Sequence, residues 1–168
     1  MTVRLRITIA LLAASICVTA LMLGGNLYEQ IVNVRYYAHD PPRTLEFHRD
    51  IMRNGYFEFY AIAPLSILVA LLAFGFAWKY KALRVWTGLA FLLLVLNAVI
   101  TFQFAVPHLD AMFFPLREPL QRPPSELQEA IRQFKTVSIV RWGESFVGLL
   151  CSLWSFAAAV WMGAKTPR

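Results

Sequence analysis

Four uninterrupted apolar runs dominate the pattern of hydrophobic and polar positions along the chain. They lie at residues 7–27, 61–78, 85–106 and 146–164, and none of them contains a formally charged side chain. Each run has about 18–22 residues, which at 1.5 Å per residue is the length that crosses a hydrocarbon layer of roughly 30 Å. A membrane β-barrel would instead alternate with period two in segments of about ten residues. The pattern therefore predicts an all-α protein with four transmembrane helices.

The composition supports insertion into a membrane. Of the 168 residues, 58% are hydrophobic and 15% are charged, whereas soluble domains have about 45–50% apolar and about 25% charged residues. A soluble core of this size cannot bury such an excess, so part of the apolar surface must face lipid. We expect one integral membrane domain over residues 1–168, with the lipid bilayer as its principal partner.

Basic residues are distributed asymmetrically. Seven of the sixteen, with no acid among them, lie at the two ends of the chain and in the short link after the second run: Arg4, Arg6, Lys79, Lys81, Arg84, Lys165 and Arg168. The segments 28–60 and 107–145 hold the other nine and all ten acids. Because basic residues in short loops mark the cytoplasmic side, we expect cytoplasmic termini and outer segments at 28–60 and 107–142, in a multi-pass protein of the cell (inner) membrane. The net charge of +6 follows from this asymmetry, and nucleic-acid binding is not expected.

The first run also has the outline of a secretory signal, since "MTVRLR" precedes it. However, the run is longer than the usual apolar region of a signal peptide, and "LMLGGNLYEQ" offers no convincing cleavage site. We therefore expect the first helix to be retained.

The outer segments predict a small helical cap. "NLYEQIVNV" keeps helical spacing beyond the first span, and "HDPP" (39–42) ends that helix because proline disfavours helix in the residue before it. Thr44 is then a candidate cap for a short outer helix that Gly55 would break. Residues 107–124 contain five prolines, which predicts a folded-back loop.

The last helix is predicted to be unusually long. "PPSELQEAIRQFK" places Ser125 three residues before Gln128, a capping-box pattern, and nothing breaks helix from there to Lys165. One helix over about 126–163 would be near 57 Å long, with the fourth span at about 143–163 and the first half outside. The expected fold is a four-transmembrane-helix bundle with an extracytoplasmic helical cap.

Ionisable residues recur at the outer ends of the spans, and they are the candidate functional residues. They are Glu29, Glu58, His108, Arg141 and Glu144, with His48 in the first outer segment. Polar groups at membrane depth tend to face the interior and mark sites, so these groups predict a polar pocket at the outer mouth, with Gln103 and Asn97 deeper. Other interpretations are solvated interface for Glu58 and Asp110, an Arg141–Glu144 ion pair, and an interhelical hydrogen bond for Asn97.

Metal binding is an alternative that the sequence leaves open. His39, His48 and His108, with Glu29 and Glu144, could form a mixed imidazole–carboxylate site, although no metal-binding spacing such as H-E-x-x-H is present. No motif indicates a cofactor, and none is expected. Many aromatic residues fall near the predicted mouth, and aromatic belts explain a large part of them. A ring-lined pocket with a few acid–base groups would also suit a flat lipophilic small molecule.

The chain resembles the anthrone oxygenase-like group of small four-helix membrane proteins, a domain of unknown function. The resemblance rests on "GGNLYEQIVNV", "DPPRTLEFH", "TFQFAVP" and "RWGESFVGLL". It implies oxidation of an anthrone-type ring by molecular oxygen without metal or flavin. Glu29, His48 or His108 would then be the base, and Arg141 would stabilise the anion.

The competing class is a non-enzymatic membrane protein that binds a small molecule or a partner, including a second copy of this chain. Small-residue steps such as Ala13–Cys17 and Gly143–Val147–Cys151 allow the close helix contacts that either assembly needs. An enzyme should bury Glu29 and Arg141 together around a cavity, whereas an interaction protein should expose them and pack the mouth shut. A transporter is less expected, because breaks near Pro64 and Gly24–Gly25 lie away from the midplane.

Overall fold

A computed structural model describes residues 1–53, 62–113 and 122–165, with the backbone alone at 50–53. These ranges are helical almost throughout and contain no strand. The all-α prediction is confirmed. Glu58 and Gly55 lie outside the described residues.

The first helix extends well beyond the first apolar run, as the sequence predicted. α1 (Val3–Tyr28) starts after Thr2, whose side chain accepts a hydrogen bond from the Leu5 amide at 3.3 Å. The helix continues through a π-helical segment, η1 (Glu29–Asn33), into α2 (Val34–Tyr37). A turn at 38–40 separates it from α3 (Pro41–Arg53). The break at "HDPP" is therefore confirmed.

The predicted cap of the outer helix is wrong. Thr44 lies inside α3, not at its start, and its hydroxyl donates back to the Asp40 carbonyl oxygen at 2.7 Å. Pro41 begins the helix instead, since the first helical position does not need a backbone N–H.

The third helix passes through Pro107, where the sequence predicted the start of a loop. α4 (Ile62–Ala77) leads through a short turn into α5 (Lys81–Ile100), which continues as the π-helical η3 (Thr101–Ala105) and α6 (Val106–Phe113). A proline ring clashes with the carbonyl four residues before it in a regular helix. The wider π turn just before Pro107 changes that spacing, which explains why the helix continues.

The long last helix is confirmed. α7 (Pro124–Lys165) has 42 residues, or about 63 Å at 1.5 Å per residue. The Ser125 capping box is wrong, because the helix starts at Pro124, two residues before the predicted 126. The Pro123 carbonyl accepts the first backbone bonds, from Glu126 at 3.0 Å and Leu127 at 3.3 Å.

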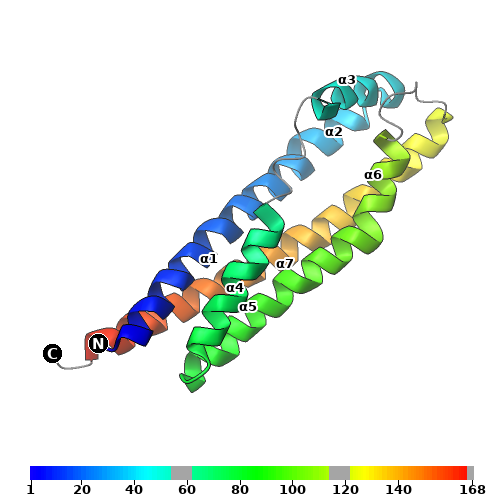
Figure 1. The fold of residues 1–168 in the computed structure, drawn as a ribbon. Coiled ribbons are helices and arrows are strands. Elements are labelled where there is room, and N and C mark those ends of the chain that lie inside the picture. The colour runs from blue at the N-terminus through cyan, green and yellow to red at the C-terminus, as the bar shows by residue number, and fades with distance from the viewer. Residues whose placement is uncertain (54–61, 114–121, 166–168) are drawn as a thin grey trace.

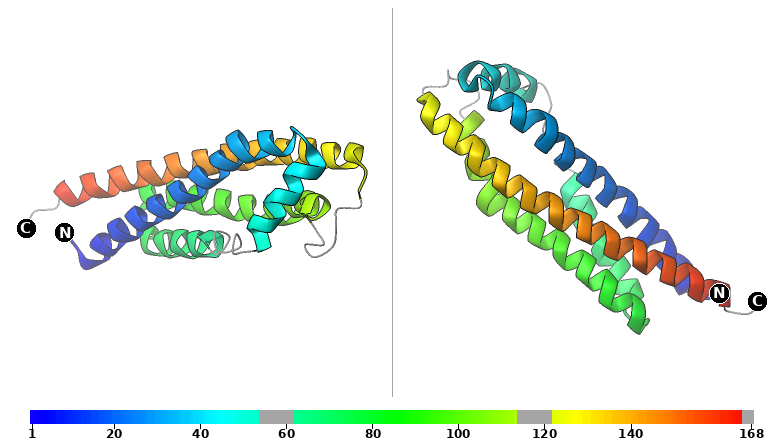
Figure 2. Two further views of the ribbon diagram at one scale, coloured as in Figure 1. Left: turned by 90° about the horizontal axis from the view of Figure 1, so that it is seen from above. Right: turned by 180° about the vertical axis from the view of Figure 1, so that it is seen from behind.

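Four helices pack around a shared interior. α1 and α5 each contact both α4 and α7, and the ribbon views show α7 alongside α1 and α5, with both termini at one end (Figures 1 and 2). Three continuous helical stretches, Val3–Tyr37, Lys81–Phe113 and Pro124–Lys165, are long and apolar enough to cross a membrane, and Ile62–Ala77 is a shorter apolar helix. Large apolar side chains such as Leu92 and Trp154 point outward. These features support a membrane protein.

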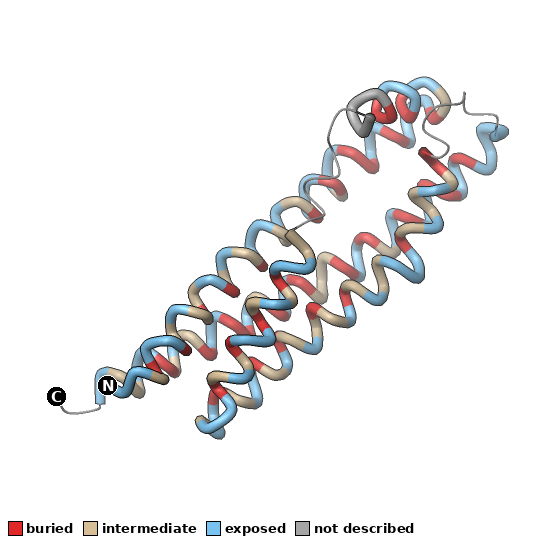
Figure 3. The backbone as a smooth tube through the Cα atoms, in the orientation of Figure 1, coloured by how far each residue is buried: buried red, intermediate tan, exposed pale blue. Residues whose placement is uncertain are grey.

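Buried positions recur along the inner faces of the helices with a seven-residue repeat (Figure 3). On α1 the repeat runs through Leu5, Leu12, Thr19 and Asn26, and on α7 through Phe134, Arg141, Gly148 and Ser155. A sustained repeat of this kind keeps one face of each helix directed at its neighbours. The π segment η3 then displaces this repeat, because the buried residues Asn97 and Ala105 are eight residues apart.

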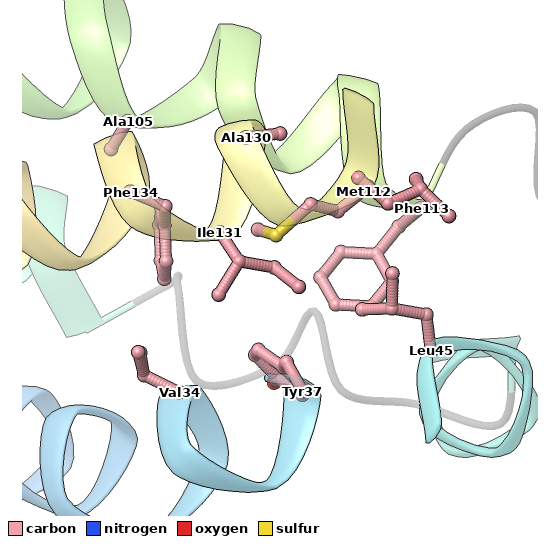
Figure 4. Close-up of a cluster of buried hydrophobic side chains, with 10 residues drawn as sticks. Val34, Tyr37, Leu45, Ala105, Met112, Phe113, Ala130, Ile131 and Phe134 are labelled. Carbon is pink, nitrogen blue, oxygen red and sulfur yellow. The ribbon is translucent and has the colours of Figure 1, made fainter. Parts of the chain in front are cut away.

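On α1 and α7 the buried faces are apolar at both ends and mainly polar between them, whereas α4 and α5 bury Ala70, Ala90 and Leu94 in the middle. The outer cluster joins α2, α3, α6 and α7 through residues that include Tyr37, Leu45, Phe113 and Phe134 (Figure 4). The terminal cluster, at the end that carries the termini, consists of Leu5, Leu12, Ala73, Ala77, Leu83 and Ala159. Between them lies what we call the polar seam: Ser15, Thr19, Asn26 and Glu29 from α1 and η1, and Ser138, Arg141, Ser145, Gly148, Ser152 and Ser155 from α7.

Candidate functional site

Arg141 is the centre of the polar seam. It projects from α7 and is only 5% exposed. Its Nη1 lies 4.0 Å from Oε2 of Glu29, and its Nη2 donates to Oδ1 of Asn26 at 3.3 Å. A guanidinium without a counter-charge in an apolar environment is strongly unfavourable, so its position depends on these two groups from α1 and η1.

Glu29 begins the π-helical segment η1 and is 7% exposed. Both η1 and η3 contact α7. Single π turns inside α-helices occur frequently at functional sites, because the extra residue displaces side chains from the regular helical face. Two of them beside the helix that carries Arg141 mark this region as specialised.

Asn97 connects α5 to the same part of α7. Its Nδ2 donates to the Arg141 carbonyl oxygen at 2.9 Å and to Oγ of Ser145 at 3.3 Å. The predicted interhelical hydrogen bond is therefore confirmed. It places α1, α5 and α7 around one buried polar cluster.

Several polar atoms of this cluster have no hydrogen-bond partner. Within the described chain, this holds for Nδ2 of Asn26, Oγ of Ser138 and Nε of Arg141, and for the acceptors Oε1 of Gln30 and Oε2 of Glu144. Each unmade bond to a buried polar group costs about 1–3 kcal/mol. The cluster is therefore equipped to bind something further.

The candidate residues predicted from the sequence do not all converge. Glu29 and Arg141 do, and both are buried. Glu144 is half-buried and interacts electrostatically with Arg141, but the carboxylate within 4.0 Å of the guanidinium is that of Glu29 on another helix. Gln103 is exposed, because six residues after Asn97 turn a helix by about 240° from the buried face.

His108 does not belong to the cluster. It lines an open groove with six residues of α6 and α7, among them Glu126, Glu129 and Gln133. Glu129 lies twelve residues before Arg141, about 18 Å along α7. Asp110 is exposed, as expected for a residue at a solvated interface.

His48 lies in the outer cap. Its Nε2 is 2.9 Å from the Tyr37 hydroxyl, and its ring packs against Tyr37 and Phe113 with centroid distances of 4.9 and 5.4 Å. Burial lowers the pKa of His48 from its ordinary 6.5, because the apolar cap disfavours the charged imidazolium. Tyr37 is more than two helical turns beyond Glu29, so His48 and the cluster are separate features.

The histidines and carboxylates proposed as a mixed metal site are dispersed. Across the described ranges, no group of three His, Cys, Asp or Glu side chains could hold a metal ion. His39 is exposed in the turn before α3, while His48 and His108 lie in different parts of the outer end.

The helical spacing places Asn26 on the same polar face as Glu29 without marking it as a site residue, and sequence reasoning missed Ser138 altogether. The available signal was the seven-residue spacing: Asn26 follows Thr19 by seven, and Ser145 and Ser152 follow Ser138 at the same interval. Small hydroxyl and amide residues on one repeat of an apolar helix predict a buried polar face.

Comparison of the chain with protein-family models, with curated proteins and with solved structures finds no match. The resemblance to the anthrone oxygenase-like group therefore remains a prediction from short motifs.

Proposed function

We propose that the chain crosses the membrane four times with both termini inside, and that its polar seam is an acid–base site for a lipophilic aromatic substrate. Three long apolar stretches and the apolar α4 support the spans, and the charge asymmetry supports the orientation. In this arrangement α2, α3 and α6 form the outer cap.

One observation carries the proposed activity: Glu29 and Arg141, 112 positions apart in the sequence, are buried within 4.0 Å of each other. A carboxylate can accept a proton from a weakly acidic carbon or hydroxyl group, and the neighbouring guanidinium can stabilise the anion that results. Both effects are stronger in a buried site, where any water is confined, than in bulk water.

The proposed reaction follows the resemblance to the anthrone oxygenase-like group. Glu29 removes a proton from the ring methylene that lies opposite the carbonyl, and the electron pair is delocalised through the flanking aromatic rings onto the carbonyl oxygen near Arg141. Dissolved oxygen accepts electrons from the carbanion and forms a carbon–oxygen bond, and Glu29 returns the proton to give a hydroperoxide. Loss of water then breaks the O–O bond and the second C–H bond. In total, one methylene and one O₂ give one carbonyl and one H₂O.

The geometry favours Glu29 over the two histidines as the base. His48 is engaged with Tyr37 in the cap, and His108 lies beside the Glu126–Glu129 groove. Neither is near Arg141, whereas Glu29 is its ion-pair partner.

The test is oxygen consumption and quinone formation by the purified protein in detergent, with an anthrone as substrate. Glu29→Gln should abolish both, and Arg141→Gln should reduce them by a factor of 10² or more, the usual contribution of one charge-stabilising group. Arg132→Gln is the matched control, because Arg132 is an exposed arginine on the same helix. Equal activity in Glu29→Gln and the unmodified protein would reject the proposal.

A non-enzymatic binding protein is the second candidate, because the outer cluster packs tightly over the end of the helices, with Phe113 and Phe134 fully buried. This alternative would be favoured if an anthrone binds to the purified protein in a fixed ratio and is not converted. The binding should then be lost in Arg141→Gln.

A further inference from the structure

Two contrasting sets can be distinguished among the buried hydroxyl groups of the described helices. In the first set, the hydroxyl donates to a carbonyl of its own helix: Thr8 to Arg4 at 2.9 Å, Thr87 to Leu83 at 2.7 Å and Ser152 to Gly148 at 3.1 Å. This is the usual arrangement for serine and threonine inside a helix. In the second set, Thr19, Ser138 and Ser155 have no partner in the described structure, although each is at most 2% exposed.

The second set is aligned along the polar seam. Thr19 lies seven residues from Asn26, about 10 Å along α1, and Ser155 lies fourteen residues from Arg141, about 21 Å along α7. Ser145, Gly148, Cys151 and Ser152 occupy the intervening buried positions of α7, and all four are small side chains. Unpartnered atoms therefore occur along the seam, not only beside Arg141.

Leaving these groups unpartnered would be costly. Five buried atoms of the seam lack partners: Thr19 Oγ1, Asn26 Nδ2, Ser138 Oγ, Arg141 Nε and Ser155 Oγ. Each such atom would lose the hydrogen bonds that water provides in the unfolded chain, so a stable fold requires partners for them. Water is the partner that fits, because it both donates and accepts, and because buried polar groups without protein partners usually bond to internal water.

We infer that the polar seam holds a file of water molecules running from Arg141 to Ser155. The terminal cluster closes the file at its far end, since Leu5, Leu12 and Leu83 there are at most 4% exposed. The file is therefore open only at its Arg141 end. At that end the side chains of Gln30 and Glu144 are half-buried. Its role as the route by which Glu29 exchanges protons rests on the proposed function, but its existence does not.

Cysteine accessibility tests the file, because a thiol reacts with a small charged methanethiosulfonate only where water reaches it and the thiolate can form. In a Cys17→Ala/Cys151→Ala background in lipid bilayers, Thr19→Cys and Ser155→Cys should be modified, with Thr19→Cys the faster of the two. There are two matched controls, and both should stay unmodified. Leu153→Cys lies near Ser155 but is exposed on the surface of the helix bundle, and Leu12→Cys lies in the terminal cluster.

Two outcomes would overturn the inference: no reaction at either seam position, or reaction at Leu12→Cys and Leu153→Cys at the same rate. Water-edited solid-state NMR of the unmodified protein gives the same decision without substitutions, since Thr19 should receive magnetisation from water faster than Thr8. Neither measurement uses a substrate. A dry seam with anthrone turnover would reject the file alone, and a hydrated seam without turnover would reject only the proposed reaction.

Discussion

Breaking the Arg141–Glu29 pair from one side should destabilise the protein more than removing both charges together. Arg141→Gln leaves the Glu29 carboxylate buried without its counter-charge. Removing one partner of a buried pair costs about 3–5 kcal/mol. The 4.0 Å separation of Nη1 and Oε2 is longer than a charge-assisted hydrogen bond, which favours the lower end of that range.

A second estimate gives a similar value. A carboxyl group with an ordinary pKa can escape burial as an anion by taking up a proton, which at pH 7 costs about 3.5 kcal/mol. That cost is an upper limit on the penalty, so we expect Arg141→Gln to lower the free energy of unfolding by about 3 kcal/mol. Glu29→Gln should cost about the same, because the guanidinium then retains only its bond to Asn26.

The double variant Glu29→Gln/Arg141→Gln should cost only about 1–2 kcal/mol, because no buried charge remains and mainly the hydrogen bond to Asn26 is lost. The assay is reversible unfolding in mixed micelles by titration with a denaturing detergent, with all variants on one cycle. Arg132→Gln, which breaks the exposed pair with Glu129, should change little. Single-variant costs that add within about 0.5 kcal/mol would show that the two residues do not interact.

Three further predictions follow from the packing and the cap. Asn97→Leu, which removes the bonds to the Arg141 carbonyl and Ser145, should lower stability in the same titration by about 1 kcal/mol, and an unchanged midpoint would contradict the α5–α7 connection. Phe134→Ala should lower the free energy of unfolding by about 3–5 kcal/mol, because this ring is fully buried in the outer cluster. Phe102→Ala is the control and should have little effect on the midpoint, because this side chain is 72% exposed. Similar losses in the two variants would reject the assigned burial. Because burial lowers the pKa of His48 below 6.5, the unfolded cap binds protons before the folded cap does as the pH falls. Thermal unfolding, followed by a fluorophore on α3, should therefore shift to lower temperature below about pH 6.5. His48→Phe should remove this pH dependence, and an unchanged pH profile in that variant would show that His48 is not its cause.

Much of the helical layout could be predicted from composition and breaks. The apolar runs, the break at "HDPP" and the length of α7 each depend on local chemistry that the sequence displays directly. Asn97 was also predictable, because a single amide in an apolar run has few alternatives to an interhelical hydrogen bond.

The π segments could not be predicted, and they explain several errors. A helical projection assumes 3.6 residues per turn, so it cannot show that η3 displaces the buried face by one residue, or that the helix passes through Pro107. The partner of Arg141 was equally hidden. Local spacing favoured Glu144 at i+3, whereas the packing of α1 against α7 brings in Glu29.

The most direct test of the account is the distance between the side chains of Arg141 and Glu29 in the folded protein. Solid-state NMR recoupling between ¹⁵N-labelled arginine and ¹³C-labelled glutamate, in an Arg132→Gln background that removes the exposed pair, measures it in bilayers. We predict clear dephasing of a glutamate carboxyl signal that disappears in Glu29→Gln, as expected for atoms 4.0 Å apart. Absence of dephasing, or dephasing that persists in Glu29→Gln, would contradict the buried pair on which the proposed site depends.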